Sequence, residues 1–380
     1  MSDPIYSKMT LFFGRRWPTA QFLSLSRYYL RMIFFGNADR LWIFRVNHLK
    51  NRQFLRSLAL ITVTGAMTTM ASGQALLLDD FEAVVPPLPL NLFNIGDSVG
   101  EGEAADGTIG SVNHAVVWST GYANNDSVQA INERLEDIDP PAYNENNSTR
   151  DAALNQAVSG ADMADFAAQA QAVSTAAQSL PDGRADAVAV LLGNNDVCAD
   201  SLADMTPATE FEAQYRQGLD ILAGTGFPDN LNLHISSIPA IYWLWYVKRE
   251  NTFCRSFIWP FVPCQNLLAN AGTDDCASAA STADPDTIYA GDGAVCQRRK
   301  NFHARIRDVY NPILRDVLAE YQANDSLPNA EYIDIFDSGF EEFHINDGDC
   351  FHPSVAGQAM LAEEQWCRSR WGIDNPACTP

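Results

Sequence analysis

Four apolar runs after residue 89 have the composition of buried β-strands. They cover residues 90–95, 186–192, 231–238 and 331–336. Asp186-Ala-Val-Ala-Val-Leu-Leu192 is nearly continuous in apolar residues, which is typical of a strand covered on both faces of a parallel sheet. A shorter run at 113–118 predicts one more strand.

Stretches with helical composition alternate with these runs. Residues 161–178 are rich in Ala and Gln without Gly or Pro, and we expect further helices, the third of them kinked at Pro312. These helices are predicted at 127–136, 207–223, 298–323 and 354–371. Because strand and helix alternate from 90 to 371, the pattern favours an α/β fold with a central parallel sheet and helices on both faces.

Residues 242–297 interrupt this alternation and predict an insertion. The segment holds four of the eight cysteines and opens with an aromatic cluster, Tyr242-Trp-Leu-Trp-Tyr246. Aromatic residues follow at 253–261. They are candidates for a wall or lid around an acyl chain, although aromatic side chains more commonly fill a core.

The first 89 residues have the composition of a targeting segment followed by a linker. A basic stretch around Lys50 and Arg56, an apolar run from Leu58 and small residues up to Ala75 fit a signal peptide with its core at 50–75. A single membrane-anchoring helix is the alternative. We therefore expect an N-terminal extension and signal at 1–75, a proline-rich linker at 76–89 and one domain at 90–380.

The charge is strongly uneven along the chain. The whole sequence has a net charge of −22, with ten basic and two acidic residues in 1–75. The remainder holds 15 basic and 45 acidic residues, a net charge of −30. Such a surface repels nucleic acid and anionic membranes, so neither is expected as a partner.

All eight cysteines lie after residue 197, and an even number behind a signal peptide predicts disulfides. No pair has the CxxC spacing, which argues against a zinc site. Many pairings are possible; short loops weakly favour Cys254–Cys264, Cys276–Cys296 and Cys367–Cys378.

Two candidate active-site residues follow predicted strands. Ser98 comes directly after Gly96-Asp97 at the end of the first run, and Asn195 follows Gly193 at the end of the second. Active sites of doubly wound folds form at the carboxyl ends of strands. A serine there can act as a nucleophile, and an amide N–H can stabilise an oxyanion. Each motif alone is also common as a helix cap or a polar turn.

Two further candidates lie in predicted loops. Gly160 can offer a backbone N–H to an oxyanion, and Asp349 stands three residues before His352, where it can orient the imidazole. His344 is the one serious rival to His352 as a base. His114 and His234 lie in predicted strands and are expected to be structural.

The order Ser98, Gly160, Asn195 and Asp349-x-x-His352 resembles the four blocks of the SGNH (GDSL-type) hydrolase superfamily over residues 90–371. The resemblance implies the three-layer α/β/α, flavodoxin-like fold of that superfamily and a serine esterase without cofactor or metal. It implies Ser98 as nucleophile, His352 as base and Asp349 as its orienter. The Ser98 and Gly160 N–H groups and the Asn195 amide would form the oxyanion hole.

Three stretches look like the phospholipase B-like branch, namely GNNDVC at 193–198, YNPILRDVLAEY at 310–321 and DCFHPSVAGQ at 349–358. The expected protein is a secreted or periplasmic, monomeric esterase or lipase acting on a small ester or a (lyso)phospholipid. Val99-Gly-Glu-Gly after the nucleophile and the insertion depart from the family pattern. A carbohydrate O-acetylesterase and a catalytically silent envelope binding protein remain as alternatives.

Overall fold

In the computed structural model, the four main apolar runs form one parallel sheet in the order β3-β4-β5-β6. The strands are Leu92–Gly96, Ala187–Leu191, Asn232–Ser236 and Ala330–Ile333. Leu92 lies opposite Ala187, Ala187 opposite Asn232 and Leu233 opposite Ala330. The carboxyl ends of all four strands therefore meet at one edge of the sheet, where the candidate residues follow.

The structure describes residues 30–34, 42–46, 88–123, 126–138, 154–181, 183–372 and 378. The chain divides into two units, Met1–Phe81 and Glu82–Pro380. In the first unit, β1 (Leu30–Phe34) pairs antiparallel with β2 (Trp42–Val46). The predicted signal core at 50–75 and residues 76–87 of the predicted linker lie outside the described residues.

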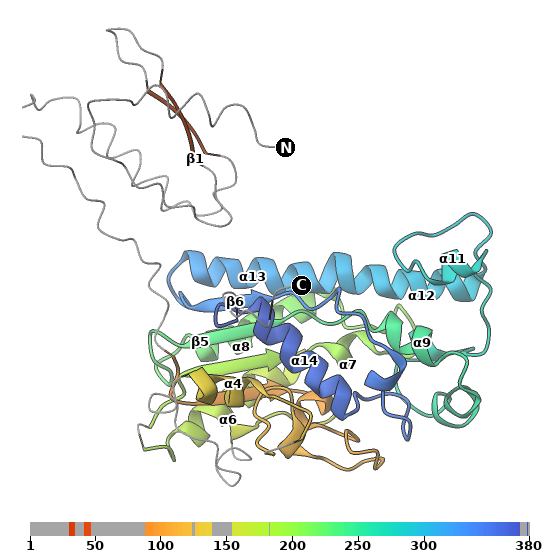
Figure 1. Cartoon of the computed structure of the whole chain (residues 1–380), viewed down its shortest axis with the longest axis horizontal. Helices are drawn as coiled ribbons and strands as arrows, with labels where there is room; N and C mark the ends of the chain where they lie inside the picture. Colours follow the sequence, from red (N-terminus) through yellow and green to blue (C-terminus); the bar gives the residue numbers. More distant parts are fainter. Residues whose placement is uncertain are drawn as a thin grey trace, which may run out of the picture. The chain divides into compact units, whose positions relative to one another are not determined.

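Helices cover both faces of the sheet, as the alternation predicts. On one face, side chains such as Phe93 and Val188 pack against α6 (Phe166–Ala177), α8 (Ala208–Leu222) and α13 (Asn311–Ala323). On the other face, residues such as Leu92 and Ala189 pack against α4 (Ile131–Ile138) and α14 (Val355–Arg368). Successive strand residues point to opposite faces, which explains the continuous apolar runs. The molecule is the three-layer α/β/α fold expected of an SGNH hydrolase (Figure 1).

The remaining elements connect these layers. Two short helices follow the strands β3 and β4 directly, namely α3 (Ser98–Glu101) and α7 (Asn194–Val197). The others are η1 (His114–Val116), α4 (Ile131–Ile138), η2 (Met163–Asp165), α9 (Tyr242–Lys248), η3 (Cys254–Ile258), α10 (Gln265–Leu268), α11 (Ala279–Thr282), α12 (Ala294–Arg305), η4 (Ile306–Tyr310) and η5 (Glu342–His344). Among the described residues, no helix has the length and apolar composition needed to span a membrane.

Two sequence expectations differ from the structure. Residues 113–118 form no strand: His114–Val116 is a 3₁₀ turn, because the Asn113 side chain accepts a hydrogen bond from the Ala115 N–H and starts a turn. The helix predicted at 298–323 is one long rod (Figure 1) of α12, the π-helical η4 and α13. Its hydrogen-bond pattern changes over Ile306–Tyr310, just before Pro312.

The disulfides correct one of the three pairings favoured by short loops. Cys276–Cys296 and Cys367–Cys378 form as expected. Cys254–Cys264 does not form; Cys254 instead bonds Cys350, and Cys264 bonds Cys198. The physical reason is that both ends of residues 254–264 pack with buried cysteines against the core. The two long-range bonds tie the segment to the sheet-end loops rather than closing it on itself.

Candidate active site

Ser98 stands where the first strand of the sheet turns into a short helix. β3 is fully buried and ends at Gly96, whose N–H and C=O both bond the Gln169 side chain of α6 at 2.9 Å. A Cβ on Gly96 would approach the Leu191 carbonyl oxygen to 2.9 Å, so close packing of the strand ends requires glycine. The Asp97 side chain caps α3 by accepting from the Val99 N–H. The strand end thus holds Ser98 in one place.

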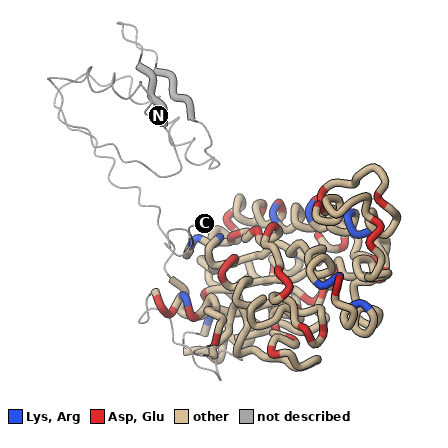
Figure 2. The backbone as a smooth tube through the Cα atoms, turned by 45° about the vertical axis from the view of Figure 1, so that its right-hand side comes forward, with Lys and Arg blue, Asp and Glu red and all other residues tan. Residues whose placement is uncertain are grey.

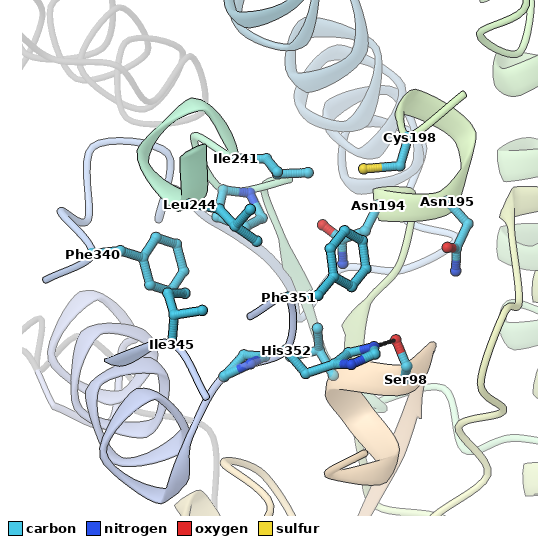
Figure 3. A pocket seen from close by; sticks show the side chains of 13 residues that line it. Ser98, Asn194, Asn195, Cys198, Ile241, Leu244, Phe340, Ile345, Phe351 and His352 are labelled. Carbon is cyan, nitrogen blue, oxygen red and sulfur yellow. Dashed lines mark hydrogen bonds between the residues drawn. The ribbon is translucent and has the colours of Figure 1, made fainter. Parts of the chain in front are cut away.

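A continuous chain of hydrogen bonds links Ser98, His352 and Asp349. The His352 Nε2 lies 2.9 Å from the Ser98 Oγ, and its Nδ1 lies 2.7 Å from Asp349 Oδ2 (Figure 3 shows the first of these). Asp349 Oδ1 also accepts the Phe351 and His352 N–H groups at 3.0 and 3.1 Å. These backbone bonds fold the loop back on itself, so that the carboxylate meets the imidazole of the same short segment.

The surroundings of His352 favour its protonated form. Burial by itself lowers the pKa of His352, but the hydrogen bond and charge of Asp349 raise it, and the charges of Glu103 and Asp97 add to this. The result is a pKa above the ordinary histidine value of 6.5. Glu103 Oε2 lies 3.9 Å from the His352 Nε2. An imidazolium formed here during a reaction would therefore be stabilised from two sides.

Gly160 reaches this edge because residues before it run alongside β3. Asn155 forms a parallel bridge with Asn94, and the Gln156 and Val158 N–H groups bond the Asn94 and Gly96 carbonyl oxygens at 2.9 and 3.1 Å. Glu101 of α3 accepts both the N–H and the hydroxyl of Ser159. Gly160 has φ +84°, a conformation that favours glycine. The turn thus lies beside α3, which carries Ser98.

Asn195 follows β4, the neighbour of β3, and lines the same pocket as Ser98. Its Nδ2 donates to the Ala161 carbonyl oxygen at 2.8 Å, which fixes the amide and joins it to the Gly160 turn.

The adjacent Asn194 donates to Asp97 Oδ2 at 2.8 Å. Burial raises the pKa of Asp97 to about 6, against the lowering effect of the Asn194 bond. The structure therefore gathers Ser98, Gly160, Asn195, Asp349 and His352 at one edge of the sheet.

The pocket beside Ser98 is lined mainly by apolar side chains, with Ser98, Asn194, Asn195 and His352 as its polar members. Figure 3 shows Ser98, Asn194 and Asn195 on one side and Phe340 and Ile345 on the other. Further lining comes from Cys198, Pro239, Ile241, Leu244, Phe351 and Pro353. The predicted aromatic residues do not line the pocket: Tyr242, Trp245 and Trp259 are buried in the core, and the phenylalanines at 253, 257 and 261 are exposed. From this part of the chain, α9 gives the pocket Leu244. Nothing in the sequence distinguished Leu244, which lies between two tryptophans, from an ordinary core residue.

The other histidines are held elsewhere. His344 Nδ1 accepts the Glu341 N–H inside η5, and its ring packs on Phe343. His234 is buried in β5 against Trp371, and His303 lies 3.1 Å from Asp286. Sequence reasoning missed the supporting residues Asp97, Asn194 and Glu103. Their only signal was adjacency to the Ser98 and Asn195 motifs.

A serine, histidine and carboxylate in series at the strand ends of an α/β/α fold define the arrangement of a serine hydrolase. The family model for GDSL-like Lipase/Acylhydrolase matches residues 92–364. The chain therefore belongs to this family, whose members are ester hydrolases. The match begins at β3 and ends within α14, so it spans the whole sheet and all the candidate residues. No curated protein matches the chain.

Proposed function

We propose that this protein is a secreted serine lipase or esterase that cleaves carboxylic esters with an apolar acyl chain through an acyl-enzyme on Ser98. The observation that carries the proposal is the Ser98–His352–Asp349 hydrogen-bond chain opening into an apolar pocket. Membership of the GDSL-like lipase family supports the reaction class.

The acid–base chemistry follows from the two nitrogens of His352. Asp349 accepts the Nδ1–H, which leaves Nε2 free to take the Ser98 proton as Oγ attacks the ester carbonyl carbon. The carbonyl π electrons move to oxygen and form a tetrahedral oxyanion. When the C–O bond breaks, the imidazolium returns its proton to the leaving alcohol. Water repeats both steps and releases the carboxylic acid and free Ser98.

The oxyanion would rest on three donors. The N–H groups of a first helical turn have no partner within the helix, and Ser98 begins α3. Gly160 N–H and Asn195 Nδ2 complete the set, held by the Glu101–Ser159 and Asn195–Ala161 bonds. A preorganised donor of this kind contributes about 3–4 kcal/mol to the transition state.

The lining of the pocket supports a hydrocarbon chain as the acyl group. Leu244, Ile345 and Phe351 offer no hydrogen bond that would recognise a sugar, whereas they can cover methylene groups. We therefore propose a lipid ester, with (lyso)phospholipid as the expected class. Four disulfides support an oxidising location outside the cytosol.

The test is hydrolysis of p-nitrophenyl esters from acetate to palmitate by the purified chain, beside Ser98→Ala. We expect activity that rises from acetate to longer acyl chains and a loss of about ten-thousand-fold or more in kcat for the variant. Folding of the variant is checked by circular dichroism. Activity confined to acetate would favour an acetylesterase. A folded wild-type chain inactive on every ester and on lysophosphatidylcholine would refute the proposal.

A further inference from the structure

Three phenylalanines of the insertion point to solvent, although they are among the largest apolar side chains of the protein. Phe253, Phe257 and Phe261 are 47%, 65% and 84% exposed. The Phe253 and Phe257 rings stack at a centroid distance of 6.1 Å. Single exposed apolar residues are ordinary, but a group of stacked aromatic rings on one short segment marks an interaction surface. We call these three residues the phenylalanine patch.

The opposite side of the same segment is firmly packed. Cys254, Trp259 and Cys264 are buried, and the Trp259 Nε1 donates to the Cys350 carbonyl oxygen at 2.8 Å. The Asn251 side chain caps the turn by accepting from the Phe253 N–H. The segment therefore has one side packed against the core, and it presents the patch to solvent on its other side.

Two disulfides join this segment to the pocket. Cys264 is bonded to Cys198, which lines the pocket, and Cys254 is bonded to Cys350, the neighbour of the lining residue Phe351. The segment between Cys254 and Cys264, with Phe257 and Phe261 on it, is thus attached at both ends to the walls of the pocket. The segment that carries the patch is therefore covalently joined to the loops that form the pocket.

The charge around the patch differs from that of the rest of the molecule. Residues 251–273 contain one arginine, Arg255, and no aspartate or glutamate, and the carboxylates next to this stretch along the chain are Glu250 and Asp274 at its ends. Elsewhere acidic residues are spread over the second unit, as Figure 2 shows. Carboxylates next to the patch would have to lose water on contact with a lipid surface, at a high cost in free energy. Their absence suits an apolar partner, and the strongly negative protein would be repelled by anionic lipid.

We propose that the phenylalanine patch docks the enzyme on the surface of neutral or zwitterionic lipid aggregates, so that the pocket receives its ester from the lipid phase. The proposal deepens the function proposed above and rests on it. In this position the aromatic rings enter the boundary between head groups and acyl chains, while the packed side keeps the segment folded.

The test measures binding and hydrolysis separately. Binding of the Ser98→Ala chain to phosphatidylcholine vesicles is measured by flotation, with and without Phe257→Ser and Phe261→Ser. Each phenylalanine that leaves water on docking contributes roughly tenfold in partition. We therefore expect the double substitution to weaken binding by about a hundredfold. Ile138→Ser, at a residue of α4 that is 51% exposed, is the matched control and should bind as before.

Hydrolysis of monomeric p-nitrophenyl butyrate keeps the two proposals apart. With Ser98 present, the F257S/F261S chain should hydrolyse this soluble ester at the wild-type rate, since neither side chain lines the pocket. Vesicle binding that is absent in the Ser98→Ala chain, or unchanged by the double substitution, would overturn docking and leave the esterase intact. A dimer that the substitutions convert to monomer, with vesicle binding unchanged, would assign the patch to a second copy instead.

Discussion

One side of the pocket around Ser98 is polar and carried by the sheet, whereas the other is apolar and carried by connections. Ser98 and Asn195 follow directly from the adjacent strands β3 and β4, and the Gly160 turn runs alongside β3. Phe340, Ile345 and Phe351 come from the connection between β6 and α14, and Leu244 comes from α9.

The two sides are also fixed by different forces. Backbone ladders and buried side-chain amides, such as Gln169 on Gly96, set the polar side. The Cys198–Cys264 and Cys254–Cys350 disulfides tie the insertion to the pocket wall. The comparison teaches that the sheet positions Ser98 and Asn195, whereas the connection between β6 and α14 carries both the Asp349–His352 pair and part of the apolar wall. Wall residues outside that pair, such as Leu244, can vary without moving the strand ends.

The largest expected effect on the rate comes from a substitution on the polar side of the pocket. Asn195→Ala removes one of the proposed oxyanion donors and should lower kcat by about a hundred- to a thousandfold. The loss should be the same for butyrate and decanoate esters, because the donor acts on the carbonyl oxygen common to both. Steady-state rates on the two esters measure it. A loss that differs strongly between the two chain lengths would place Asn195 in acyl recognition instead.

A smaller effect is expected on the apolar side. Leu244→Ala removes part of the wall and should reduce the kcat/KM ratio of decanoate to acetate esters by about tenfold. Because Leu244 is buried, the variant should also lose about 2–5 kcal/mol in free energy of unfolding. Leu219→Ala, at an equally buried core position of α8, is the control. It should lose stability with an unchanged ratio, and an unchanged ratio in Leu244→Ala would contradict the acyl pocket.

The smallest effect is electrostatic and concerns the protonation of His352. Since only neutral His352 can accept the Ser98 proton, hydrolysis should fall as pH decreases through a pKa above 6.5. Glu103 raises that pKa, so Glu103→Gln should move the acid limb of kcat/KM to lower pH. The shift should be small, because the Glu103–His352 pair is partly exposed to solvent. Glu210→Gln in α8 serves as the control, and a shift to higher pH would exclude this role for Glu103.

Much of the fold was predictable because its signals are local. The run 186–192 is apolar at almost every position, so it predicted the buried β4 without knowledge of its partners. Residues 113–118 contain the apolar stretch Ala115–Trp118 but no strand, since the Asn113 side chain accepts a backbone N–H and starts a 3₁₀ turn at His114–Val116. Local patterns fail where one side chain redirects the backbone.

The sequence by itself determined the strands, their parallel arrangement and the candidate residues Ser98, Gly160, Asn195, Asp349 and His352. Their types and order identify the chemistry, and strand ends meet at one edge of a parallel sheet. Only the tertiary structure decided the bonding of Cys254 to Cys350, the apolar wall from Leu244 to Ile345 and the approach of Glu103 to His352. These contacts join residues far apart in the chain, and no periodicity along the sequence records which distant side chains will pack together.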